Sequence, residues 1–76
     1  MAPDPDPDAI VWRDAEGGII ACFEKNKVMR ENFAELRQFA QDAFEDAVLM
    51  GCDEQQVREA LVELMAGLVN PYAGRR

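Results

Sequence analysis

The chain has 76 residues, of which 49% are hydrophobic and 30% are charged, a composition typical of one small folded domain. Fifteen acidic side chains against eight basic ones give a net charge of -7, which disfavours nucleic acid as a partner because phosphates require a basic surface. No apolar run reaches the roughly 18 residues of a membrane span, and no secretory leader opens the chain. We therefore expect contact with neither nucleic acid nor membrane.

The first eight residues alternate proline with aspartate after Met1-Ala2. Proline cannot join a helix or sheet interior, and the aspartates repel one another, so residues 1–8 are expected to form a disordered acidic tail. A specific docking peptide is the alternative interpretation. Residues 9–76 are then expected to form a single small helical domain.

Two short apolar runs, Ile10–Trp12 and Ile19–Phe23, flank the pair Gly17-Gly18. β-Branched and aromatic residues on both sides of a double glycine favour a small β-hairpin. An irregular extended arm is the alternative. In either form the segment needs another element to lie on, because two isolated strands are barely stable in water.

A helical pattern begins near Cys22 and continues to Gly51. Apolar residues recur there at alternating steps of four and three, which predicts a long helix over about 22–50. Val28 and Phe39 widen this apolar face on one side. The residues of the repeat itself are Met29, Phe33, Leu36, Ala40, Ala43, Ala47 and Met50.

A shorter helix is predicted over about 53–69. Asp53 is the expected N-cap, and Val57, Leu61, Leu64 and Leu68 provide its apolar face. Asn70-Pro71 is expected to end it, since proline disfavours helix at the preceding residue. A joint as short as Gly51-Cys52 makes the two helices run back on each other. The predicted fold is therefore all-α, an antiparallel helical hairpin with a short N-terminal arm.

The two predicted helices differ in length, so the second leaves the start of the first uncovered. Leaving Met29 and Phe33 exposed would forgo roughly 3–6 kcal/mol of burial free energy. We expect a homodimer that forms a four-helix bundle. The alternatives are that residues 10–23 of the same chain, or an unrelated protein, cover the start of the first helix.

The expected interface combines this apolar face with two single aromatic residues. Small alanines allow two helices to approach closely, although they equally fit internal packing against the leucines of the second helix. The sole tryptophan and the sole tyrosine have the amphipathic character of interface anchors, although capping the ends of the core is the alternative. The predicted interface residues are Trp12, Val28, Met29, Phe33, Leu36, Phe39, Ala40, Ala43, Ala47 and Tyr72.

No catalytic, cofactor-binding or metal-ligating set is predicted. The chain has no histidine, the commonest general base and metal ligand. The acidic residues near Asp42 lie opposite the apolar face, where hydrated surface charge is expected. Cys22 and Cys52 are expected to be reduced thiols of a cytoplasmic protein, too far apart for an internal disulfide.

These features favour a non-catalytic protein–protein interaction module, such as a small adaptor, a chaperone-like protein or a regulatory subunit. One alternative is a small regulator of transcription or a toxin–antitoxin-type partner. A small enzyme that depends on a metal or a thiol is a further alternative.

Overall fold

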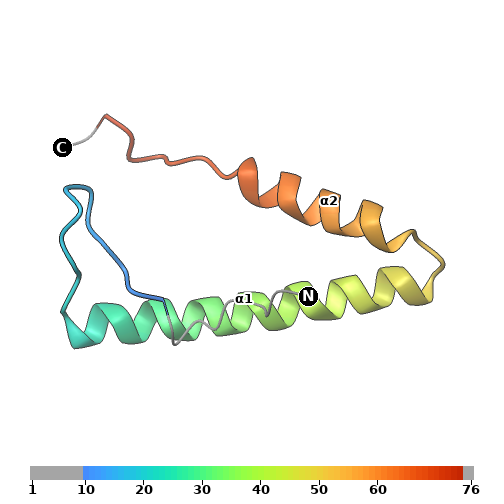
Figure 1. The fold of residues 1–76 in the computed structure, drawn as a ribbon, viewed down its shortest axis with the longest axis horizontal. Coiled ribbons are helices and arrows are strands. Elements are labelled where there is room, and N and C mark those ends of the chain that lie inside the picture. The colour runs from blue at the N-terminus through green and yellow to red at the C-terminus, as the bar shows by residue number, and fades with distance from the viewer. Residues whose placement is uncertain (1–9, 75–76) are drawn as a thin grey trace. The chain divides into compact units, whose positions relative to one another are not determined.

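The structure is a computed structural model that describes residues 10–74. It contains two helices, α1 (Phe23–Leu49) and α2 (Glu54–Ala66), which form a hairpin (Figure 1). No strand occurs within the described residues, so the all-α prediction is confirmed. The predicted tail, residues 1–8, lies outside the described residues. The chain divides into two compact units, residues 1–39 and 40–76, and α1 contributes to both.

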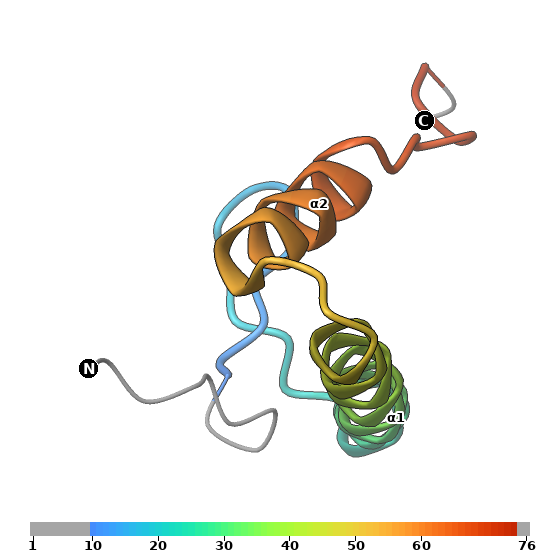
Figure 2. The ribbon, with the colours of Figure 1, turned by 90° about the vertical axis from the view of Figure 1, so that its right-hand side faces the viewer.

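The first helix follows the predicted boundaries to within one residue at each end. Its first turn begins where the Cys22 carbonyl accepts a hydrogen bond from the Asn26 backbone, at 3.0 Å. It is a single helix without interruption (Figure 1), and Figure 2 looks almost along its axis. Gly51 ends it in a left-handed conformation, φ 97°, while the Cys52 backbone donates to the Ala47 carbonyl at 2.9 Å. This is the expected role of a glycine after a helix.

The second helix starts as predicted but ends earlier. The Asp53 carboxylate accepts a hydrogen bond from the Gln56 backbone at 2.9 Å, which confirms Asp53 as the N-cap. The predicted end near residue 69 is wrong, because the helix stops at Ala66 and Gly67 is its C-cap. Glycine loses more backbone entropy in a helix than any other residue, so Gly67 ends the helix before Asn70-Pro71. Leu68 therefore lies outside α2.

Residues 10–22, called the arm below, form a tight turn without strands. A single antiparallel bridge joins Arg13 and Ile19, and the Ile20 backbone donates to the Trp12 carbonyl at 2.9 Å. Gly17 adopts φ 89° in the turn, a conformation that L side chains avoid. The segment thus contains one antiparallel bridge and no strand, so neither the predicted β-hairpin nor the predicted extended arm is confirmed.

No residue among 10–74 is buried. In the first unit, half-buried residues lie where the arm meets α1: Trp12, Ile20, Asn26, Met29 and Arg30. In the second unit they follow one face of each helix: Ala40, Phe44, Ala47, Val57, Leu61 and Met65. The sequence pattern predicts Leu64 on the apolar face of α2, but Met65 is half-buried and Leu64 is exposed. The half-buried residues of α2 follow one another at steps of four.

Candidate interaction surface

The arm is shaped by one aspartate. The Asp14 carboxylate accepts hydrogen bonds from the Glu16 backbone at 3.0 Å and from the Gly18 backbone at 2.8 Å. The Asp14 backbone also donates to the Gly18 carbonyl at 2.8 Å. A short carboxylate that satisfies nearby backbone donors is the standard local device for stabilising a turn. This turn brings the two apolar runs of the arm side by side.

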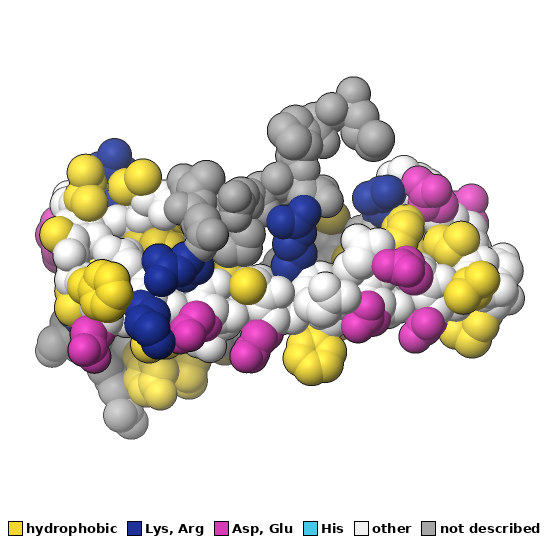
Figure 3. Space-filling model, turned by 90° about the horizontal axis from the view of Figure 1, so that it is seen from below, with side chains coloured by type: hydrophobic (Ala, Val, Ile, Leu, Met, Phe, Trp, Pro, Cys, Tyr) yellow, Lys and Arg dark blue, Asp and Glu magenta, His cyan; other side chains and the backbone are white. Residues whose placement is uncertain are grey.

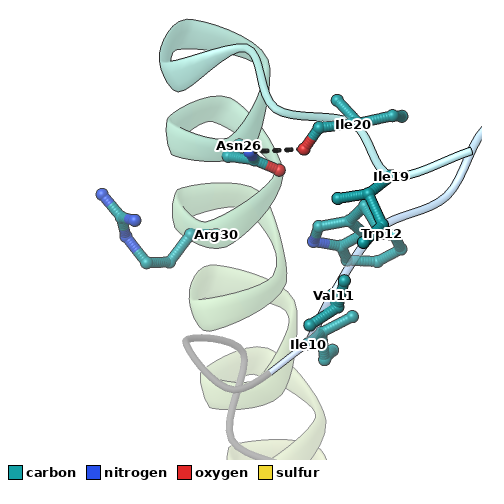
Figure 4. A pocket seen from close by; sticks show the side chains of 7 residues that line it. All are labelled: Ile10, Val11, Trp12, Ile19, Ile20, Asn26 and Arg30. Carbon is teal, nitrogen blue, oxygen red and sulfur yellow. Dashed lines mark hydrogen bonds between the residues drawn. The ribbon is translucent and has the colours of Figure 1, made fainter.

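Two contacts hold the arm on the first turns of α1. The rings of Trp12 and Phe33 lie with their centroids 5.0 Å apart and their planes tilted by 50°, within the range of favourable aromatic pairs. The Asn26 side-chain amide donates to the Ile20 carbonyl at 2.9 Å (Figure 4). The arm therefore covers part of the apolar face that the short second helix was predicted to leave open.

A shallow pocket of about 270 Å³ lies between the arm and α1 (Figure 4). The arm provides apolar walls, and α1 adds two polar side chains. Its lining residues are Ile10, Val11, Trp12, Ile19, Ile20, Asn26 and Arg30. This volume is just below the range of small-molecule sites.

In the second unit a cation–π contact links the two helices. The Arg58 guanidinium of α2 lies 4.6 Å from the centroid of the Phe44 ring on α1. Arg58 also forms an ion pair with Glu54 at 3.3 Å. Half-burial of Ala40 and Ala47 on the same side of α1 as Phe44 agrees with the internal-packing interpretation of these alanines.

The remaining apolar surface is large. Figure 3 shows apolar side chains lying among carboxylates and bases on one face of the molecule. Among the described residues, large hydrophobic side chains are exposed on the arm, on α1, on α2 and after α2. They include Val11, Phe23, Val28, Phe39, Leu49, Met50, Val62, Leu64, Leu68 and Val69. Exposed apolar side chains mark interaction sites in soluble proteins where they form contiguous patches.

The structure places the predicted interface residues in three environments. Trp12 and Phe33 contact each other. The half-buried group consists of Met29, Ala40 and Ala47. The exposed group consists of Val28, Leu36, Phe39, Ala43 and Tyr72. The predicted interface residues therefore differ in exposure, and Phe33, at 38%, is also among the exposed ones.

Charge is distributed unevenly along the described chain. Residues 10–39 hold five bases and five acids, whereas residues 40–74 hold seven acids and Arg58 as their only base. Lys27 and Glu31 form an ion pair at 3.1 Å, with both side chains about half exposed. Such a surface pair contributes little to stability. The difference in net charge between residues 10–39 and 40–74 instead affects which charged partners each part attracts.

Cys22 lies at the N-terminus of α1, and this position affects its acidity. A hydrogen bond from the Lys25 backbone is the main cause that lowers the pKa of the thiol, and desolvation opposes it; the Glu24 backbone and the Lys25 charge add smaller lowering effects. The folded state therefore favours the Cys22 thiolate. The thiolate's contribution to stability is present above the pKa of the unfolded chain and is lost as pH falls through the pKa of the folded chain. Both cysteines are free and exposed.

Within residues 10–74, no three cysteine or carboxylate side chains come together as a metal site would require. Neither α1 nor α2 combines the length and apolar content needed to cross a bilayer. Comparison with known proteins found no matching family model, no matching curated protein and no matching solved structure.

Sequence reasoning missed two parts of the surface. Val11, Ile19 and Ile20 were assigned to the arm but not to a pocket, because the approach of the arm to α1 depends on tertiary contacts. Val28 and Phe39, on the exposed side of α1, belong to the predicted interface set, which leaves out Met50 although Met50 is 77% exposed.

Proposed function

We propose that this chain is a non-catalytic protein–protein interaction module, such as a small adaptor, a chaperone-like protein or a regulatory subunit. It acts through its helical surface and associates as a homodimer with a four-helix core. The observation that carries the proposal is that no described residue is buried while large apolar side chains are exposed on both helices.

The magnitude of this exposure supports a partner. Fully burying one Val, Leu, Phe or Met side chain is worth about 1.5–3 kcal/mol, and small domains unfold with about 5–15 kcal/mol. Covering Phe39, Leu64 and Leu68 alone is therefore comparable to the whole stability of a small domain. A domain of this size buries too little surface to be robust by itself, and association is the remedy that needs neither metal nor disulfide.

The arm reduces, but does not abolish, the apolar surface that is exposed at the start of α1. Through Trp12 it contacts Phe33, which is still 38% exposed, so the start of α1 does not depend wholly on a second chain. It leaves Val28 and Phe39 exposed. The need for a partner therefore rests on these residues and on the exposed side of α2, rather than on Met29 and Phe33.

Two other functions have less support. The acidic charge of residues 40–74 opposes a nucleic-acid-binding regulator of transcription, while a toxin–antitoxin-type partner would be a special case of the proposed module. A metal- or thiol-dependent enzyme is the other alternative, and the proposed module requires no such chemistry. Two free thiols also support a cytoplasmic location.

Thermal unfolding at a series of protein concentrations tests the proposal. If folding is linked to association, the Tm followed by far-UV circular dichroism rises with concentration, because mass action stabilises the associated state. A Tm that stays constant over a hundredfold range of concentration would show that the chain folds without a second copy and would remove the homodimer from the proposal.

A further inference from the structure

The turn of the arm is held by hydrogen bonds within the arm itself. The Arg13 guanidinium donates to the Gly17 carbonyl at 3.0 Å, and the Gly17 backbone donates to the Asp14 carbonyl at 3.0 Å. The Asp14 carboxylate accepts from the Glu16 and Gly18 backbones. In all of these bonds donor and acceptor are at most four residues apart, so the turn does not depend on α1 for them.

The arm is attached to α1 mainly through side chains. The Asn26 amide donates to the Ile20 carbonyl at 2.9 Å, and the Phe33 ring lies 5.0 Å from the Trp12 ring. In the part of the chain that the structure describes, the one backbone–backbone hydrogen bond between the arm and α1 runs from Asn26 to the Cys22 carbonyl and begins the helix. The arm is therefore not joined to α1 as a strand is joined to a sheet.

Packing between the arm and α1 is loose. A pocket of about 270 Å³ lies between them (Figure 4). No described residue of the arm is buried, since Trp12 and Ile20 are only half-buried, and Phe33 beneath Trp12 is still 38% exposed. Regions with few buried apolar contacts and exposed hydrogen bonds open locally at a low free energy. The arm should therefore open more readily than the helices unfold.

The connection between the arm and α1 provides a hinge. It consists of Ala21 and Cys22, between the Ile20 contact and the start of α1. Both residues are exposed, and among the described residues neither backbone N–H donates to a backbone carbonyl. A change in their backbone angles can lift the arm without breaking the hydrogen bonds of the turn or of the helix.

We propose that the arm is a hinged strap, which opens as one unit at Ala21-Cys22 while α1 stays folded. When closed, it covers part of the α1 face that contains Asn26 and Phe33. Any partner for that part of the face binds only the open state, so its apparent affinity falls in proportion to the open fraction. This inference does not depend on the proposed homodimer, because the arm and the face that it covers belong to one chain.

One substitution in the full-length chain weakens the strap without weakening the helix. In Asn26→Asp the carboxylate cannot donate to the Ile20 carbonyl, whereas an acidic residue near the N-terminus of a helix is favourable for the helix dipole. The matched control is Asn32→Asp, which adds the same charge at an exposed position of α1. Quenching of Trp12 fluorescence by acrylamide measures opening of the arm, and far-UV circular dichroism measures the helices.

We expect the Asn26→Asp variant to raise the ratio of open to closed arm about fivefold, which corresponds to the loss of one net hydrogen bond. Its quenching should exceed that of the wild type and of the Asn32→Asp control, with the helix signal unchanged. In the wild type, added urea should expose Trp12 before the helix signal falls. The midpoint of this first transition should be the same at every protein concentration.

Three results would overturn the strap. Coincident urea transitions of Trp12 and of the helix signal would show that the arm and the helices unfold as one unit. Equal quenching in the Asn26→Asp and Asn32→Asp variants would show that the Asn26 bond does not hold the arm. A Trp12 transition whose midpoint rises with protein concentration would show that a second chain holds the arm.

Discussion

At the scale of single residues, the arm is held by two side chains of different chemistry. Asn26 donates one hydrogen bond to the Ile20 carbonyl, worth about 1 kcal/mol net. Phe33 provides a ring contact to Trp12, worth about 0.5–1.5 kcal/mol beyond the area buried. These contributions are small, so removal of either one should loosen the arm without unfolding the helices.

Replacing Phe33 with alanine should release Trp12 to water. Trp12 is the only tryptophan, so its fluorescence reports the arm directly. In the Phe33→Ala variant we expect emission shifted to longer wavelength and stronger quenching by acrylamide, with little loss of helix signal. The matched control, Leu64→Ala on α2, should leave the emission unchanged. Equal emission from the wild type and the Phe33→Ala variant would show that the ring contact does not hold the arm.

At the scale of elements, the local rules of helix formation predicted much of the fold. Gly51 and Asp53 mark the end of α1 and the start of α2 through a positive φ and a side-chain cap, and both signals are contained in a few neighbouring residues. The predicted end of α2 is too late because Gly67 and Asn70-Pro71 both disfavour helix. Gly67 comes first along the chain and ends α2. Hydrogen bonds of the Asp14 turn are equally local, yet the position of the arm on α1 is not.

Removing the N-cap of α2 should destabilise the hairpin by a predictable amount. The Asp53 carboxylate satisfies the Gln56 backbone donor, and replacing an N-cap aspartate with alanine costs about 0.5–2 kcal/mol. We expect the Asp53→Ala variant to have a free energy of unfolding in urea that is lower by about 1 kcal/mol. Asp53→Asn, which keeps a capping oxygen, should lose much less. Equal losses in the two variants would attribute the effect to charge rather than to capping.

At the scale of the whole molecule, which apolar residues stay exposed could not be predicted from periodicity alone. The pattern places Met29, Phe33 and Phe39 on a common broad face, but the arm contacts only part of it. Phe33 contacts Trp12 and is 38% exposed, whereas Phe39 is 73% exposed. Periodicity identifies the apolar side of a helix, and only tertiary contacts decide which residues on that side remain available to another chain.

The central claim is that this exposed surface binds a second copy of the chain. Light scattering coupled to size-exclusion chromatography measures the native mass directly. With a chain mass of 8.5 kDa, we predict a particle of two chains at high concentration that dissociates on dilution. A mass of one chain at every concentration, including the highest at which the protein stays in solution, would show that the chain does not bind a second copy of itself.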